Sequence, residues 1–289
     1  MKLLGVIGDP IEYSLSPVLF DYLFKRLELS CRYDAYRITP EGLEGFAQTC
    51  RLSGLSGVNV TIPHKETIIP HLDEVADGAR RLGAVNTVIN DDGRLTGHNT
   101  DLAGFTAPLL ARDAELDGGH AVVLGAGGAA RAVVQGLQTL NVVKITLANR
   151  SPERADALAQ ALCRDIDVET VPLSDSSLND ALAGARLLVN ATPIGMHPQA
   201  DASPLDNADG LHENLIVYDL VYRPLKTRLL ADAEAQGAAT IDGLEMLIGQ
   251  ALESFRLWLP DAPEIPTSLT TDLRGYLRGK LLDDAEVAD

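Results

Sequence analysis

Short apolar stretches alternate with amphipathic segments over the first hundred residues, which is typical of strands alternating with helices. The pattern predicts strands at 2–7, 32–38 and 56–61, and helices at 16–29, 40–52 and 71–82. The run 85–89 leads through Asn90-Asp91-Asp92-Gly93 into 95–97, which predicts a hairpin. Ser16 and Pro17 are expected at the N-cap and first position of their helix. This region is therefore expected to form a small α/β domain.

After residue 118 the strands become apolar throughout. Strands are predicted at 120–124, 143–148, 168–171, 186–190, 215–220 and 238–241, with helices at 128–140, 152–163, 176–183 and 225–236. Wholly apolar strands separated by helices favour a parallel sheet covered on both faces, a doubly wound, Rossmann-like fold. Two further helices, 244–259 and 268–282, have no strands of their own and are expected to pack back on the first domain.

The chain has 289 residues, about twice the length of a typical domain. We predict an N-terminal α/β domain, 1–104, completed by the helices of 244–289, and a nucleotide-binding domain, 105–243. No apolar run approaches the roughly 18 residues that span a bilayer. The first apolar stretch ends at Gly8-Asp9-Pro10 without a cleavage site, so it is predicted to be a strand rather than a signal peptide.

Charge and cysteine content narrow the functional classes. The formal net charge is −17, from 41 acidic and 24 basic residues, which disfavours nucleic acid and anionic membranes as partners. Three cysteines without C-x-x-C spacing indicate neither a disulfide framework nor a zinc site, and no other metal-ligand cluster is evident. We expect a cytoplasmic protein that binds a small molecule, as a monomer or a homodimer, without a metal.

A glycine-rich turn points to a dinucleotide. Gly125-Ala126-Gly127-Gly128-Ala129-Ala130 has the G-x-G-x-x-A spacing and lies between a predicted strand and helix. The first glycine permits a tight turn, the second lets the backbone approach a pyrophosphate, and Ala130 allows close helix packing. The alternative is a tight loop of the kind found in any α/β protein. We predict that Gly125, Ala126, Gly127, Gly128 and Ala129 contact the cofactor.

The end of the next strand indicates which nucleotide binds. NAD sites usually place a carboxylate there, but this strand ends in Asn149-Arg150-Ser151, with Arg154 shortly after. Two arginines at a helix start suit a 2′-phosphate, and the Ser151 hydroxyl adds a donor. The alternative is a solvated pair of surface arginines. We predict NADP, bound by Asn149, Arg150, Ser151 and Arg154.

Several further segments place hydroxyls, amides or a charge at strand ends. They are GDPIEYSLSP (8–17), NVTIPHK (59–65), GAVNT (83–87), GHNTD (97–101), NATPIGM (190–196), YDLVYRP (218–224) and DGLEMLIGQA (242–251). In order, and over nearly the whole chain, these segments resemble the shikimate dehydrogenase family. The resemblance implies NADP-dependent interconversion of 3-dehydroshikimate and shikimate, on the route to chorismate and aromatic amino acids, in a cleft between two α/β domains.

Substrate contacts follow from the resemblance. It implies that Ser14 and Ser16 bind the substrate carboxylate, and that the ring oxygens are contacted by Thr61, Asn86, Gln250 and Tyr222. Taken singly, each is also explained by a turn or a polar helix position, and Ser16 by its N-cap position.

Lys65 and Asp101 are the candidates for proton transfer. Hydride reduction of a ketone leaves an alkoxide that needs a proton. A positioned acid that supplies this proton raises the reaction rate about 10²–10⁴-fold. Lys65 follows Pro63 at a predicted helix start, where the dipole disfavours a cation by only ~0.3–1 kcal/mol. We predict that Lys65 donates the proton as ammonium and that Asp101 orients both Lys65 and the substrate hydroxyl. The alternative is a surface lysine and a loop aspartate.

The resemblance also implies cofactor contacts at Asp77, Leu220, Gly243 and the loop of Thr192. A side chain at position 243 is expected to block the nicotinamide ring. The chain departs from the family at three positions, where Tyr13 replaces a histidine and Phe20-Asp21 replaces His-Asn. Both serines of that motif are present, so carboxylate binding is still implied.

Two other functions remain open on the sequence. One is a quinate/shikimate dehydrogenase that uses NAD, against which Asn149-Arg150 argues. The other is a catalytically idle NADP-binding regulator, against which Lys65 and Asp101 argue. A folate-linked dehydrogenase lacks support from the paired serines.

Overall fold

The chain forms two compact units in a computed structural model that describes residues 1–112, 114–163, 166–173 and 176–288. The first unit comprises Met1–Thr100 and Gln250–Lys280, and the second comprises Asp101–Gly249 and Leu281–Asp289. These divisions fall within a few residues of the predicted domain boundaries at 104/105 and 243/244, except that the contacts assign the chain end to the second unit. The boundaries themselves stay predictions.

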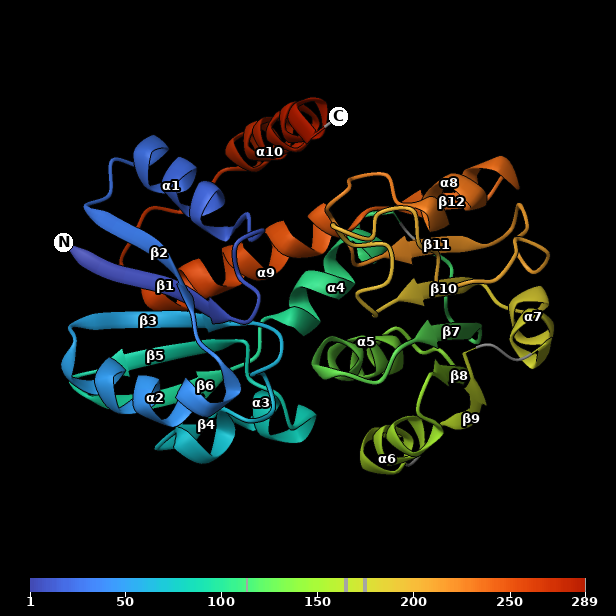
Figure 1. The fold of residues 1–289 in the computed structure, drawn as a ribbon, viewed down its shortest axis with the longest axis horizontal. Helices are drawn as coiled ribbons and strands as arrows, with labels where there is room; N and C mark the ends of the chain where they lie inside the picture. Colours follow the sequence, from blue (N-terminus) through green and yellow to red (C-terminus); the bar gives the residue numbers. More distant parts are fainter. Residues whose placement is uncertain (113, 164–165, 174–175, 289) are drawn as a thin grey trace. The chain divides into compact units, whose positions relative to one another are not determined.

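A mixed six-stranded sheet forms the centre of the first unit (Figure 1). Its strands are β1 (Lys2–Gly8), β2 (Cys31–Arg37), β3 (Leu55–Val60), β4 (Glu74–Val75), β5 (Thr87–Asp91) and β6 (Arg94–His98), in the order β2-β1-β3-β5-β6-β4. β1 is parallel to β2 and β3, whereas β5 is antiparallel to β3 and β6. Asp92 and Gly93 both have positive φ (48° and 90°), as a two-residue hairpin turn requires, and the predicted hairpin is confirmed.

Helices connect these strands. They are α1 (Ser16–Arg26), α2 (Leu43–Leu52) and α3 (Asp77–Leu82), with short 3₁₀ helices η1 (Pro40–Gly42) and η2 (Ile69–His71). The predicted helix 71–82 is wrong in its first half. β4 pairs there with β6, and the Asp73 amide donates to Leu95 O at 3.0 Å, so sheet pairing overrides the local helical pattern.

The C-terminal helices complete the first unit, as predicted. α9 (Gly243–Trp258) begins in the second unit and continues into the first, followed by α10 (Thr267–Ala288). Trp258 Nε1 donates to Val88 O at 3.0 Å, and Lys2 Nζ donates to Trp258 O at 2.8 Å. A Cβ at Gly57 of β3 would lie 2.2 Å from Trp258 Nε1, so only glycine lets α9 come this close to the sheet.

The second unit contains a wholly parallel six-stranded sheet (Figure 1). Its strands are β7 (His120–Leu124), β8 (Lys144–Asn149), β9 (Asp167–Pro172), β10 (Leu187–Asn190), β11 (Ile216–Asp219) and β12 (Ala239–Ile241), in the order β12-β11-β10-β7-β8-β9. The strand order reverses between β7 and β10, the point where open α/β sheets bind their ligands. The predicted Rossmann-like fold is confirmed.

Helices cover both faces of this sheet. They are α4 (Asp101–Leu110), α5 (Gly128–Thr139), α6 (Pro152–Leu162), α7 (Ser176–Ala183) and α8 (Arg228–Ala235). Alternate strand residues face two buried clusters, one with α4, α5 and α6 and the other with α7 and α8. The sequence pattern predicted no helix at α4, whose Phe105 stacks on Tyr218 with ring centroids 5.4 Å apart.

Candidate active site

Several strand ends of the first sheet lie at one edge. Parallel β1 and β3 end at Gly8 and Val60, and antiparallel β5 begins at Thr87, opposite Asn59. β6 ends at His98, opposite Thr87. The loops after β1, β3 and β6, and the loop before β5, therefore leave the sheet at the same edge. They carry the predicted substrate residues Ser14, Ser16, Thr61, Lys65 and Asn86.

Ser14 and Ser16 lie between β1 and α1. The Ser16 amide donates to Ser14 Oγ at 3.3 Å. Ser16 is the first residue of α1, and the N-cap is Leu15, which already has helical dihedral angles (φ −82°, ψ −7°) and no side-chain cap. The predicted N-cap role of Ser16 is therefore wrong. Its hydroxyl does not cap the helix, which removes the structural explanation for this serine.

Lys65 lies in a series of turns, residues 62–68. Its carbonyl accepts from the Val85 amide at 2.7 Å, and buried His64 bonds through Nε2 to Ile38 O at 2.6 Å. These contacts hold the segment against its neighbours in turns, and only the 3₁₀ helix η2 follows. The predicted helix start at Lys65 is wrong, so a helix dipole does not act on this ammonium.

Asn86 is buried immediately before β5. Its Oδ1 accepts from the Thr100 amide at 2.7 Å, and its Nδ2 donates to Thr100 Oγ1 at 2.8 Å. Asp101, the next residue of the chain, is buried and begins α4. A carboxylate in the first turn of a helix interacts favourably with the helix dipole. Asn86 thus holds Thr100, the residue directly before the first residue of α4.

Asn86 belongs to a buried group of uncharged side chains. We call it the neutral cluster: Asn59, Asn86, Thr87, Thr100 and Ser254. Asn59 Nδ2 lies 3.1 Å from Thr87 Oγ1 and 3.0 Å from Ser254 Oγ, and the two hydroxyls are 2.8 Å apart. The Ser254 hydroxyl also donates to the Gln250 carbonyl at 3.0 Å, so the predicted residue Gln250 lies one helical turn from this cluster.

The glycine-rich turn follows β7 at the reversal point of the second sheet. Gly125 has φ +106°, and a Cβ there would lie 3.0 Å from Ala191 O. Gly127 is the N-cap of α5 without a side-chain cap, and a Cβ there would meet no atom within 4 Å. Ala130 is buried in the α5 core, as predicted. An open helix N-terminus with free backbone donors is suited to a pyrophosphate.

The Asn149–Arg154 segment joins β8 to α6. Asn149 Nδ2 donates to Ser151 O at 2.8 Å and so closes the turn, a structural task beside its predicted contact with the cofactor. Arg150 and Arg154 are exposed, and their guanidinium groups form no ion pair within the described residues. Both are thus available to an anionic ligand.

A buried carboxylate joins the loops after β10 and β11. Asp219 Oδ1 accepts from Asn190 Nδ2 at 2.9 Å and from the Val221 amide at 3.0 Å, and its Oδ2 accepts from Thr227 Oγ1 at 2.6 Å. We call these four residues the carboxylate cluster. Burial raises the pKa of Asp219 to about 6, although the three hydrogen bonds act in the opposite direction.

Gly243 packs against the loop after β11. A Cβ at this position would lie 2.3 Å from Leu220 O and 2.7 Å from Val221 C. The glycine is therefore required by close backbone packing, a reason different from the expected clearance of the nicotinamide ring.

Family comparisons match both units. The shikimate dehydrogenase substrate-binding domain matches residues 6–88, and the shikimate/quinate 5-dehydrogenase family matches residues 109–216. A curated NADP⁺-dependent shikimate dehydrogenase of Symbiobacterium thermophilum is 43% identical over 260 residues, which cover 89% of this chain and 88% of the relative. This chain belongs to the shikimate dehydrogenase family.

Solved structures of the family agree in fold. The shikimate 5-dehydrogenase of Thermus thermophilus, in complex with NADP(H) and shikimate, is 40% identical with a TM-score of 0.83, covering 96% of this chain and 99% of that one. A quinate dehydrogenase of Corynebacterium glutamicum in complex with NAD is 34% identical, also with a TM-score of 0.83, covering 95% and 97%. The family fold thus occurs with both kinds of cofactor.

Two predicted site residues, Tyr222 and Asp77, belong to a different unit from the other residues predicted to bind the same ligand. Half-buried Tyr222 belongs to the second unit, whereas the other residues expected to contact the ring oxygens belong to the first. Exposed Asp77 begins α3 in the first unit, whereas the other predicted cofactor residues belong to the second.

The departures from the family motif have different surroundings. Phe20 is fully buried and stacks on Tyr33, with ring centroids 4.3 Å apart, and Tyr33 in turn donates to Asn59 Oδ1 at 2.7 Å. Asp21 pairs with Lys25 at the surface, and Tyr13 is 40% exposed. Phe20 therefore supports the neutral cluster through one aromatic neighbour.

Neither polar cluster was predicted as a unit. Segments 59–65, 83–87 and 97–101 were singled out, but Asn59, Thr87 and Thr100 were not assigned, and Ser254 lies outside the quoted segments. Asp219 stands in a quoted motif without a role. The signal available in the sequence was a set of polar residues at predicted strand ends, which does not identify their hydrogen-bond partners.

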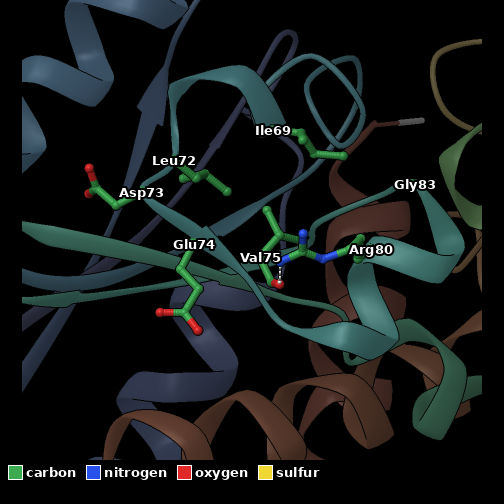
Figure 2. A pocket seen from close by; sticks show the side chains of 7 residues that line it. All are labelled: Ile69, Leu72, Asp73, Glu74, Val75, Arg80 and Gly83. Carbon is green, nitrogen blue, oxygen red and sulfur yellow. Dashed lines mark hydrogen bonds between the residues drawn. The ribbon is translucent and has the colours of Figure 1, made fainter.

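A surface pocket of about 350 Å³ lies between η2 and α3 (Figure 2). It is lined by Ile69, Leu72, Asp73, Glu74, Val75, Arg80 and Gly83. Arg80 donates to Val75 O at 2.8 Å, and the two acids pair elsewhere, with Arg51 and Arg94. None of the predicted site residues lines this pocket.

Within the described part of the chain, no group of three or more His, Cys, Asp or Glu residues could hold a metal ion. Over the same residues, no helix has both the length and the apolar character needed to cross a membrane.

Proposed function

We propose that this protein catalyses the NADP-dependent, reversible reduction of 3-dehydroshikimate to shikimate, a step toward chorismate and aromatic amino acids. The observation that carries the proposal is the set of loops at one edge of the first sheet, which bear paired serines, Lys65 and buried Asn86. The names of the relatives support the same reaction.

The substrate is a ring carboxylate with several hydroxyls. We assign the carboxylate to the hydroxyls of Ser14 and Ser16, because hydrogen bonds to a charged group contribute about 1.5–3 kcal/mol each. The hydroxyl of Ser16 is left available by a helix that caps at Leu15. The ring oxygens are assigned to Thr61, Asn86, Gln250 and Tyr222.

NADPH supplies the hydride when it is bound. In the reducing direction, Lys65 donates a proton as ammonium to the developing alkoxide oxygen. Asp101 accepts hydrogen bonds from the ammonium and from the substrate hydroxyl, and so orients both. Its place in the first turn of α4 supports this assignment, because the helix dipole favours a carboxylate there.

The cofactor residues fit NADP. Gly125, Ala126, Gly127, Gly128 and Ala129 would hold the pyrophosphate at the α5 N-terminus, where backbone donors are open. The 2′-phosphate is assigned to Asn149, Arg150, Ser151 and Arg154. Asp77, Thr192, Leu220 and Gly243 complete the set. We also propose that the domains divide at 104/105 and 243/244, and that the enzyme works in the cytoplasm.

One assay separates the candidate functions. Initial rates are measured with shikimate and with quinate, each with NADP and with NAD. We expect the highest kcat/KM with shikimate and NADP. Preference for quinate with NAD would indicate the NAD-dependent alternative, and no rate above background in any combination would indicate an idle NADP-binding regulator.

A further inference from the structure

We propose that Asp219 is a positioning residue that fixes the loops of Thr192 and Leu220 for the nicotinamide half of the cofactor. This inference rests on the proposed function, which assigns those two loops to the cofactor. Asp219 itself touches only protein groups in the described structure.

The three partners of Asp219 come from three different segments. Asn190 ends β10, Val221 follows β11, and Thr227 is the N-cap of α8. All three act as donors, and two of them are a backbone amide and a side-chain amide whose N–H groups cannot reverse. The two fixed N–H donors share Oδ1, and the Thr227 hydroxyl reaches Oδ2. An asparagine would keep the contacts of Oδ1, with the Thr227 hydroxyl reversed, but it would lose the charge that strengthens all three hydrogen bonds.

Asn190 transmits this orientation to the Thr192 loop. Its Oδ1 accepts from the Thr192 amide at 3.0 Å and from Thr192 Oγ1 at 2.7 Å. Its Nδ2 donates to Asp219 and also to Ile194 O at 3.2 Å. Because Asp219 accepts from Nδ2, it selects the amide orientation in which Oδ1 faces Thr192.

The loops held in this way contact the predicted cofactor glycines. A Cβ at Gly125 would lie 3.0 Å from Thr192 Cγ2, and one at Gly243 would lie 2.3 Å from Leu220 O. A small displacement of either loop would therefore change the space at the edge of the sheet where the glycine-rich turn lies. Asp219 is expected to act on cofactor binding through these loops.

The test compares Asp219→Asn, Thr227→Val and Thr227→Ser with the wild type. We expect Asp219→Asn to raise the KM and Kd for NADP about tenfold, the factor that follows from one charged hydrogen bond. The KM for shikimate should stay within about twofold. Thr227→Val should shift the NADP constants in the same direction, and Thr227→Ser, which keeps the hydroxyl, should restore them.

Thr146→Val is the matched control. Thr146 is buried in the same sheet, and its hydroxyl bonds His120 Nε2 at 2.9 Å near the opposite ends of the strands. This variant loses a buried hydrogen bond but should leave both KM values unchanged.

Two outcomes would overturn the inference: NADP constants within twofold of wild type in both Asp219→Asn and Thr227→Val, or equal rises for NADP and shikimate. The Kd for NADP is measured by calorimetry, independently of turnover. Wild-type protein that binds NADP but does not oxidise shikimate would contradict the proposed function alone, and the Kd comparison would still decide the role of Asp219.

Discussion

The two polar clusters both join loops through buried hydrogen bonds, but the neutral cluster contains no charged group and the carboxylate cluster contains one. Each is buried at the edge of a sheet and joins loops that carry predicted site residues. In the neutral cluster every member both donates and accepts, so hydroxyl groups can rotate to satisfy one another. In the carboxylate cluster three donors converge on Asp219, whose ionised form accepts from all of them.

The difference has an energetic consequence. The described residues of the neutral cluster bury no charge, so its contribution to stability should not depend on pH. The carboxylate cluster buries an ion without a cationic partner among its hydrogen-bonded neighbours, and this raises the pKa of Asp219. Burying that charge reduces stability but fixes three segments in one arrangement. The neutral cluster thus positions its groups without charge, and the carboxylate cluster does so with it.

The largest effect is expected from removing the proposed proton donor, Lys65, which belongs to neither cluster. Lys65→Ala should lower kcat for shikimate oxidation about 10²–10⁴-fold, because a positioned acid–base group contributes that factor. The KM for NADP should not change. Ser14→Ala is the comparison variant and should mainly raise the KM for shikimate. If Lys65→Ala kept kcat within about threefold while Ser14→Ala did not, the assignment of Lys65 would be wrong.

The second prediction compares the clusters by the pH dependence of stability. A pKa of about 6 in the folded state against 3.8 unfolded means that folding is favoured by about 3 kcal/mol less above pH 6 than below pH 4. The free energy of unfolding of Asp219→Asn minus that of wild type should therefore rise by up to that amount as the pH rises through this window.

Thr87→Val is the neutral counterpart in that measurement. Its difference from wild type should stay constant between pH 4 and pH 8, since its hydrogen-bond partners Asn59, Asn86, Thr100 and Ser254 do not titrate. Parallel pH profiles for Thr87→Val and Asp219→Asn, measured by urea unfolding, would contradict the contrast between the clusters.

The third prediction concerns exposed charge in the second unit. Arg150→Gln should raise the KM for NADP about tenfold and leave the KM for NAD unchanged, because only NADP carries the 2′-phosphate. Added salt should reduce the difference, since both arginines are exposed. Arg228→Gln is the control, an exposed arginine in the same unit that pairs with Asp232 at 2.9 Å. Equal losses with the two cofactors would argue against a phosphate contact.

The smallest effect is expected in the neutral cluster. Thr87→Val removes one hydroxyl between Asn59 and Ser254, and an uncharged hydrogen bond contributes only about 1 kcal/mol. The KM for shikimate should rise about fivefold while the KM for NADP stays constant. Thr87→Ser should restore the wild-type value. A rise in the KM for NADP instead would place this cluster on the cofactor side.

Sequence patterns predicted the second sheet better than the first. Strands that are apolar throughout identify a parallel sheet, and Asp92-Gly93 identifies a hairpin, because both signals are local. β4 was missed because two residues form it only by pairing with β6. The N-cap of α1 was misplaced by one residue, since Leu15 adopts helical dihedral angles.

The candidate site was predictable as motifs but not as a network. Short polar motifs at strand ends located the loops, and the family resemblance supplied the residues. Hydrogen-bond partners depend on register and on distant contacts, and Asn59 and Ser254 are separated by 195 positions in the chain. No local pattern could pair them. The same holds for Asp219, whose Asn190 partner lies on the neighbouring strand.

The interrupted course of the first unit has a consequence for synthesis. Its first hundred residues leave the ribosome early, but Ser254 and Trp258 emerge only after the whole of 101–249. Until then the Val88 carbonyl and the surface beside Gly57 have no helix to cover them. The nascent segment 1–100 therefore lacks part of its core while residues 101–249 can already fold. Truncation before residue 250 would leave this surface uncovered permanently.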